Sequence, residues 1–330
     1  MQFLNQIWQF DLQSSVLPAI LFASGAGLFF LLAAVCGPLL GAGAEFIHAV
    51  SRKAFYDKCA LQINQTAFVS AVFIAAPLIA AFFLGILRPL PFPARDTDLF
   101  AAANFKILAP LGLFLAFILF FLLYLRVWST RGPRPLRFCA GLCSSLASLL
   151  LLVLGLLFFL YLPDPEIALL LDTDPTAAIL EMLENFAFTR HLWPAPLYLL
   201  GTGLGAAASL ARVWLIWRRR KADYGRDYYL FAMRGLARAA FVLVPAATGA
   251  GVWLFFSLEN FIPLALRQTA DPVLALLSLG LPLLCCALHL AGAVAENPMR
   301  HKAGSVLASL CLLGAFCSQL TLLFNSYPAA

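Results

Sequence analysis

Eight long apolar stretches alternate with shorter polar gaps along the chain. Each is near or above the roughly 20 residues that cross a bilayer as a helix. Hydrophobic residues make up 62% of the sequence and charged residues 12%, a composition that excludes a soluble globular protein. The pattern predicts an all-α polytopic membrane protein with eight transmembrane helices. The stretches run approximately Leu17–Ala44, Ala67–Leu87, Phe105–Leu125, Phe138–Leu162, Trp193–Trp217, Ala239–Leu258, Val273–Val294 and Ser305–Asn325.

The basic residues are distributed unevenly over the gaps. Seventeen of the twenty-two Lys and Arg lie in or beside alternate gaps, whereas eleven of the sixteen acids lie on the other side. Loops rich in Lys and Arg stay in the cytoplasm. The chain is therefore expected in the inner (cytoplasmic) membrane of a cell with both termini extracytoplasmic. The net charge of +6 is then explained by the basic cytoplasmic loops that set the orientation, and nucleic acid is not expected as a partner.

The segment Met1–Ser15 carries no Lys or Arg and no small-residue cleavage site before the first long apolar stretch. It does not have the features of a cleaved signal peptide. Its apolar residues, with Trp8 at the headgroup level, predict a short interfacial helix.

The second half of the sequence repeats parts of the first in the same order. Four matches across the expected helix pairs indicate a duplication into two parallel four-helix units. The predicted units are 1–163 and 193–330, joined by an acidic extracytoplasmic loop, 164–192, with one helix around Thr176–Phe188. The matches pair Leu17–Leu21 with Trp193–Leu197, Arg52–Ala54 with Arg220–Ala222, Ala67–Val69 with Ala240–Val242, and Leu146–Leu149 with Leu307–Leu310.

Ionisable groups within a bilayer are functional candidates, because each is unfavourable there unless paired. His289 is the sole histidine well inside a span. It is predicted either to hydrogen-bond a neighbouring helix as a neutral imidazole or to serve a proton or quinone site. Glu45 and His48 share a helix face at the cytoplasmic end of the first span, where the carboxylate could orient the imidazole. His48 with His289 is also the one pair that could bracket a haem b.

A second polar group gathers at the predicted outer ends of the helices. Packing of these ends could place hydrogen-bond donors around the carbonyl oxygens of a quinone, with His191 or Glu259 exchanging protons with water. Each residue alone is also typical of an interfacial anchor. The group consists of Asn104, Lys106, His191, Trp193 and Glu259.

The most polar cytoplasmic segment is a basic run that suits either anionic lipid headgroups or a cytoplasmic partner protein. Its predicted docking residues are Arg218, Arg219, Arg220, Lys221 and Arg226. The eight cysteines show no CxxC spacing, so no metal site is predicted. The sequence also lacks the nucleotide, zinc-protease and serine-hydrolase motifs, and no catalytic residue is assigned.

Eight helices in two four-helix units, with glycine-punctuated first helices at Pro18–Leu28 and Pro194–Leu204, resemble the membrane-anchor subunits of the polysulfide reductase NrfD and dimethyl sulfoxide reductase class. The resemblance is one of architecture. It implies a quinone-binding anchor that passes electrons to or from an iron–sulfur partner subunit. The alternative function is a transporter, because duplicated helical units also build transport pathways.

Overall fold

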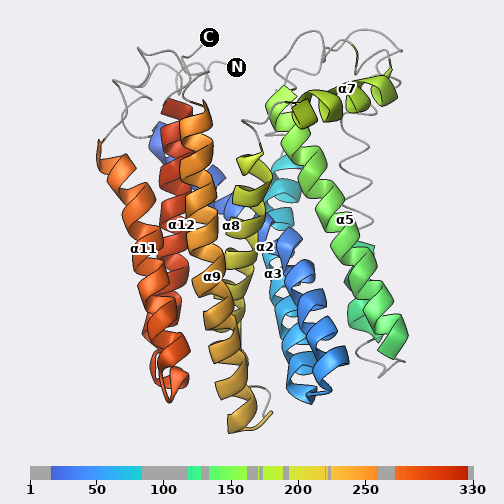
Figure 1. Ribbon diagram of the computed structural model, residues 1–330, viewed down its shortest axis with the longest axis vertical. Coiled ribbons are helices and arrows are strands. Elements are labelled where there is room, and N and C mark those ends of the chain that lie inside the picture. Colours follow the sequence, from blue (N-terminus) through green and yellow to red (C-terminus); the bar gives the residue numbers. More distant parts are fainter. Residues whose placement is uncertain are drawn as a thin grey trace.

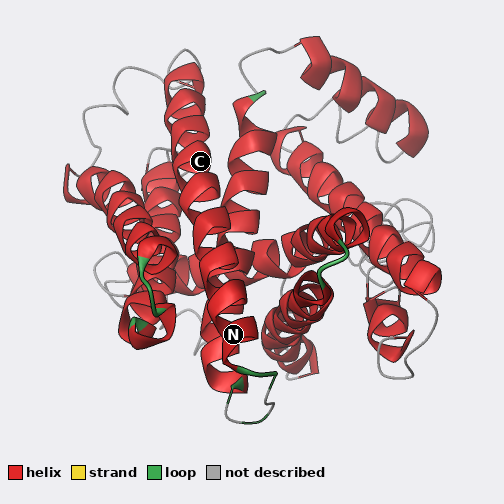
Figure 2. Cartoon of the chain, turned by 60° about the horizontal axis from the view of Figure 1, so that its bottom comes forward, coloured by secondary structure: helices red, strands yellow, loops and turns green. Residues whose placement is uncertain are grey.

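A computed structural model gives the fold of the chain. It describes residues 16–83, 118–119, 121–127, 134–161, 170, 174–188, 193–219, 221, 224–258 and 272–325. The described elements are all helical (Figures 1 and 2). They are α2 (Val16–Ser51), α3 (Ala54–Phe83), α5 (Arg134–Tyr161), α7 (Pro175–Phe188), α8 (Pro194–Arg218), α9 (Arg226–Leu258), α11 (Pro272–Val294), the 3-10 turn η2 (Pro298–Arg300) and α12 (Lys302–Asn325).

The chain is a polytopic helical membrane protein. Seven of the eight predicted apolar stretches correspond to long helices, and most of the remaining one, Phe105–Leu125, lies outside the described residues. Among the described residues, five helices are long and apolar enough to cross a membrane. Those spans are Gly25–Ser51, Pro194–Arg218, Arg226–Leu254, Leu276–Val294 and Lys302–Gln319. The predicted total of eight spans therefore stays a prediction, as does the interfacial helix at Met1–Ser15, which is also outside the described residues.

The centre of the bundle is the contact between α2 and α8. Helix α3 packs beside α2 and α9 beside α8, while α12 touches both central helices. A close backbone approach makes this possible, because a Cβ on Gly203 of α8 would lie 3.1 Å from both the Cys36 Cβ and the Leu32 carbonyl oxygen of α2. Small residues at helix crossings allow such packing in lipid, where apolar burial alone does not drive helices together.

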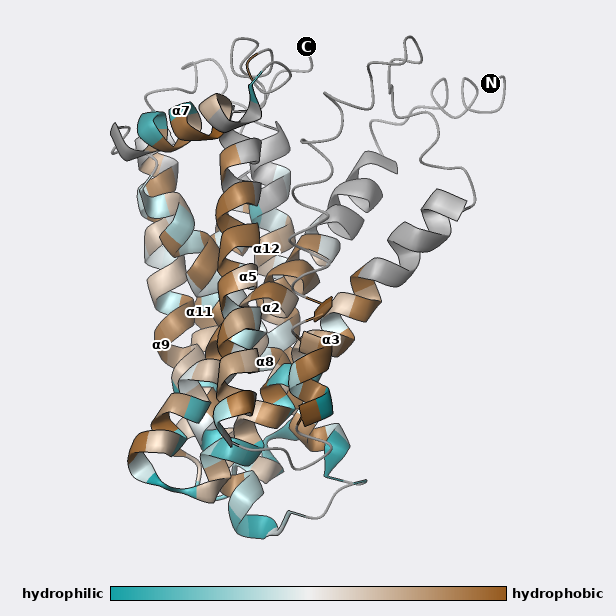
Figure 3. Ribbon diagram, turned by 90° about the vertical axis from the view of Figure 1, so that its right-hand side faces the viewer, coloured by the Kyte–Doolittle hydropathy of each residue, from teal (hydrophilic) through white to brown (hydrophobic). Residues whose placement is uncertain are grey.

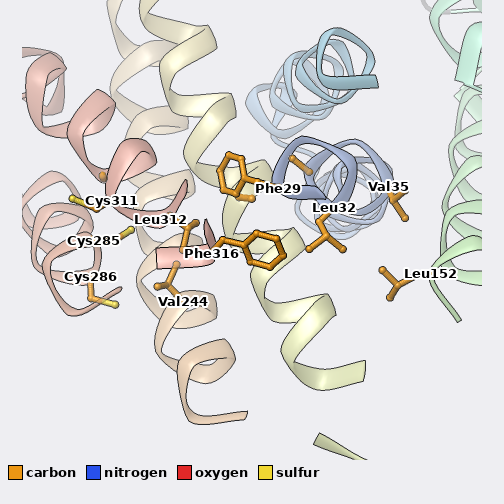
Figure 4. Packing of buried hydrophobic residues seen from close by; sticks show 13 residues of the cluster. Phe29, Leu32, Val35, Leu152, Val244, Cys285, Cys286, Cys311, Leu312 and Phe316 are labelled. Atoms are coloured by element: carbon orange, nitrogen blue, oxygen red, sulfur yellow. The ribbon is translucent and has the colours of Figure 1, made fainter. Parts of the chain in front are cut away.

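One apolar cluster connects the central helices to those around them. Phe29 and Leu32 of α2 face Leu312 and Phe316 of α12, and Val244 of α9 lies beside them (Figure 4). The buried thiols of Cys285, Cys286 and Cys311 extend the same cluster toward α11. These cysteines pack as small apolar side chains.

Helix α7 confirms the helix expected in the acidic loop. It lies across the end of α5 (Figure 1), where Ala178 and Met182 pack against Leu157. The Asp174 carboxylate accepts a hydrogen bond from the Ala177 amide at 3.1 Å and so caps the first turn.

Two helices begin earlier than the apolar pattern predicts. Helix α3 begins at Ala54 instead of Ala67, and α9 begins at Arg226 instead of Ala239. The additional turns are helical because one face of each is buried: Tyr228 and Met233 of α9 pack against Leu215 of α8. Much of the segment expected as a polar loop is therefore packed helix.

The additional turns belong to one polar end of the bundle, opposite α7, where hydrophilic residues gather (Figure 3). We call it the basic end. It comprises the turn between α2 and α3, the end of α8, the start of α9, and η2 with the start of α12. Its charged residues include Arg52, Lys53, Arg219, Arg226, Arg300 and Lys302.

Candidate functional site

A buried polar centre joins α8 to α11 near the basic end. The side chains of Arg212, Ser209 and His289 are all 0% exposed. The Nη1 group of Arg212 lies 2.5 Å from Nδ1 of His289, and the Ser209 Oγ lies 2.7 Å from Nε2. The prediction that His289 hydrogen-bonds a neighbouring helix is confirmed.

These contacts assign the protons of the imidazole. A guanidinium can only donate, so Nδ1 of His289 must accept with its lone pair. In the neutral ring the proton is then on Nε2, which donates to the Ser209 oxygen. Both nitrogens are thus engaged, and neither is open to a haem iron without the loss of a hydrogen bond. His48, the other member of the proposed haem pair, instead places Nδ1 2.9 Å from the Lys53 carbonyl oxygen at the basic end.

Arg212 brings a charge into this centre that its neighbours do not balance. Its Nε and Nη2 groups are buried and have no hydrogen-bond partner among the described residues. Gly292 of α11 makes room for the guanidinium, because a Cβ there would collide with Nη2. A buried cation with open donors is unfavourable in a low-dielectric interior. Such groups within spans are typical of functional sites.

Glu45 does not orient His48, contrary to the hypothesis from their spacing. The Glu45 carboxylate is buried and accepts a hydrogen bond from the Tyr124 hydroxyl at 2.5 Å. The two side chains share a helix but diverge, because Glu45 faces the segment containing Tyr124 and His48 faces the turn after α2.

A polar stripe along α3 was not expected from the sequence. Trp214 Nε1 of α8 donates to the Gln62 amide oxygen at 3.0 Å. Asn64 and Thr66 donate to carbonyl oxygens one turn earlier in their own helix. These residues precede the apolar stretch Ala67–Leu87, so the hydropathy pattern does not predict their burial.

An open groove of about 450 Å³ lies between α9 and α11, beside the buried centre. Its floor includes Ala293, which is one helical turn beyond His289 on α11. The walls combine apolar and charged side chains: Arg234, Arg238, Phe241, Leu290, Val294 and Glu296. Arg234 donates to the Ala295 and Glu296 carbonyl oxygens, whereas the Arg238 side chain is exposed and has no described partner. The volume falls in the range of small-molecule sites.

The predicted outer group is mostly outside the described residues. His191, Asn104, Lys106 and Glu259 are not described, and Trp193 lies 52% exposed immediately before α8. Whether these residues meet stays a prediction. Near the same end of the bundle, the Tyr198 hydroxyl of α8 donates to the Gln319 amide oxygen of α12, and the Gln319 amide donates to the Ser278 carbonyl oxygen of α11.

The basic run lies at the end of α8 and the start of α9, as expected from the sequence. Lys221 stacks over the Trp217 ring with its Nζ 4.3 Å from the ring centroid. Arg219 and Arg226 line a separate pocket, and Arg220 is outside the described residues. In the part of the chain that the structure describes, no group of three or more His, Cys, Asp or Glu side chains is placed to hold a metal ion.

Comparison with known proteins gives a similarity of fold but not of sequence. No family model matches it, and no curated sequence matches it significantly, so the NrfD class is not specifically supported. The fold is similar to that of a chain in the structure of bd oxidase from Geobacillus thermodenitrificans, with a TM-score of 0.57 and 12% sequence identity. The similarity covers 92% of this chain and 87% of that chain. The two chains share a membrane fold over nearly their whole lengths.

Proposed function

We propose that this chain is a quinone-interacting integral membrane subunit of a respiratory redox complex. The observation that carries the proposal is the fold shared with a bd oxidase chain over 92% of the sequence. Such agreement across nearly the whole of both chains favours a related role within an electron-transfer complex, although fold alone does not determine function. The chemistry must therefore come from the residues of this chain.

The groove between α9 and α11 suits a quinone headgroup. A quinone needs hydrogen-bond donors for two carbonyl oxygens. The exposed guanidinium of Arg238 supplies one set of hydrogen-bond donors. Arg234 supplies a further donor, because its Nη1 group remains available after Nε and Nη2 bond the Ala295 and Glu296 carbonyl oxygens. Phe241 and Leu290 provide apolar walls for the ring. Quinone and quinol both fit this pattern, because each presents two oxygens.

The groove is also open toward lipid and toward water. Leu283, Leu290 and Val294 expose their side chains along α11, which gives an isoprenoid tail an apolar track. Glu296 is exposed at the polar mouth and can exchange protons with water. The groove thus combines a lipid entrance with a proton exit.

Two sites proposed from the sequence remain alternatives. The outer group around His191 would bind the headgroup at the opposite end of the bundle. The inner pair of Glu45 and His48 would have to work through the hydrogen bond between Glu45 and Tyr124. The α9–α11 groove is preferred because its donors, apolar walls and volume are all described.

A partner subunit would accept electrons from the bound quinol or deliver them to the bound quinone. The architecture-level resemblance implies an iron–sulfur protein, whereas the fold neighbour favours an oxidase partner. Purification of the intact complex through a tag on this chain would show which of these two partners is present. We expect a quinone in the lipid extract, and mass spectrometry and the optical spectrum would identify the partner. A tagged chain that brings down neither quinone nor a redox protein would contradict the proposal.

The groove itself is tested by Arg238→Gln, which removes the charge but keeps a polar side chain. We expect a rise of about tenfold in the quinol KM of the complex, corresponding to one charge-assisted hydrogen bond. Lys53→Gln is the control, because it removes a charge from an exposed side chain at the same end of the bundle outside the groove. Equal KM values in both variants would exclude the groove and leave the His191 site to be tested by His191→Ala.

A further inference from the structure

A second pocket at the basic end has a different chemistry from the groove. It has a volume of about 140 Å³ and lies where α8 ends, α9 begins and η2 leads into α12. Four basic residues line it, and its lining contains no acid: Arg219, Arg226, Arg300 and Lys302. Tyr229 and Met299 form a buried floor. The four cations come from segments far apart in the sequence.

The charged groups of these four side chains have no hydrogen bond or ion pair within the part of the chain that the structure describes. Two other basic residues of the same end do have partners, because Lys58 lies over the Tyr224 ring and Lys221 over the Trp217 ring. Asp227 and Glu296 adjoin the pocket in sequence without lining it, and Asp223 is outside the described residues.

A buried amide in the lining of the pocket also favours an anion as the ligand. The Asn297 side chain lines the pocket, and its Oδ1 is buried and has no hydrogen-bond partner among the residues that the structure describes. Rotation of this amide by a half turn would present its NH₂ group there instead. A donor at this position beside four cations suits an anion with several acceptor oxygens.

We propose that this pocket binds a phosphate group, with the headgroup of an anionic phospholipid as its source. Guanidinium groups bind phosphate oxygens through paired hydrogen bonds, and Arg219, Arg226 and Arg300 offer three of them. The pocket lies at the ends of spans, where headgroups are found. Basic pockets between membrane helices on the cytoplasmic side hold anionic headgroups in this way. The bound lipid would connect α8, α9 and α12 at their basic ends.

The test uses the full-length chain in detergent and titrates it with phosphatidylglycerol, read by native mass spectrometry. We expect Arg226→Gln/Arg300→Gln to weaken binding about 25-fold, since each basic residue near an anionic headgroup contributes about a fivefold factor. Lys53→Gln is the matched control, because Lys53 is exposed at the same end but outside the pocket. Unchanged affinity in the double variant would overturn the proposal.

Two further measurements distinguish a loss of charge from a loss of folding, and binding of lipid from binding of free phosphate. Arg226→Lys/Arg300→Lys keeps both charges but loses the paired hydrogen bonds, so its affinity should fall less than that of the Gln variant; a loss equal to that of the Gln variant would overturn the role of charge. Competition by inorganic phosphate at millimolar concentration would assign the pocket to free phosphate, and failure to compete would assign it to lipid. Arg238→Gln should leave lipid binding unchanged, which keeps this test independent of the groove.

Discussion

At the scale of single residues, the principal feature is a charged side chain in the interior of the bundle. The sequence singled out His289 as the sole histidine inside a span, and the structure confirms its contact with a neighbouring helix. Arg212 is one of the seventeen basic residues that predict the cytoplasmic side, although it precedes the end of its apolar stretch by five residues. The position of Arg212 more than one helical turn inside its span is the sequence signal for a buried charge. Whether Arg212 points into the bundle or toward the cytoplasm became clear only from its side-chain contact with His289 of α11.

The pairing of Arg212 with His289 predicts strongly non-additive mutations. His289→Leu should lower the free energy of unfolding by about 2–3 kcal/mol, because it leaves a buried guanidinium without its acceptor. Arg212→Met should be much milder, since it removes the buried charge itself. The double variant should then resemble Arg212→Met. Thermal unfolding in detergent measures the cycle, and costs that simply add would show that the two side chains do not interact.

Gly292 gives a second test at the residue scale. A methyl group there must displace the Arg212 guanidinium, which is held by His289 and enclosed on all sides. We expect Gly292→Ala to destabilise the chain by about 1–3 kcal/mol. Gly280→Ala is the control on the same helix, because its added methyl meets no atom within 4 Å. If both variants unfold at the same temperature, the guanidinium is less confined than this geometry implies.

At the scale of the elements, the apolar pattern predicts helix identity better than helix length. Stretches such as Trp193–Trp217 and Val273–Val294 match α8 and α11 within one residue at each end. The starts of α3 and α9 were each misplaced by thirteen residues, because hydropathy marks where lipid begins and not where a helix begins. Tyr228, Tyr229 and Met233 bury a face against α8, which the mean hydropathy of a mixed segment does not reveal.

The crossing of α2 and α8 should depend on the absence of a side chain at Gly203. A methyl group there would lie 3.1 Å from the Leu32 carbonyl oxygen, and a backbone atom cannot move aside as a side-chain tip can. We expect Gly203→Ala to lower the free energy of unfolding by about 1–3 kcal/mol. Gly27→Ala in α2 should be neutral, since nothing lies within 4 Å of its added methyl. Equal stability of the two variants would mean that the helices separate at little cost.

At the scale of the whole molecule, the contacts are compatible with two related halves. Helix α2 packs against α3 and α5, and α8 packs against α9 and α12. These are the pairs expected if α2, α3 and α5 correspond to α8, α9 and α12. The sequence reaches this correspondence through short matches such as Leu146–Leu149 with Leu307–Leu310. Superposition of the halves by rotation about the membrane normal stays a prediction, as do the unit boundaries at 163 and 193.

The charges at the two ends predict the orientation of the bundle in the membrane. Lys53, in the turn between α2 and α3, and Glu184 of α7 are both exposed and belong to opposite ends of the bundle. If basic loops stay in the cytoplasm, Lys53→Cys should react with an impermeant maleimide only after permeabilisation, and Glu184→Cys should react in intact cells. The parent for both variants carries Cys139→Ser and Cys143→Ser, since Cys139 is exposed and Cys143 only half-buried. The reverse labelling pattern would invert the bundle, and the basic end with its groove and phosphate pocket would then face outward.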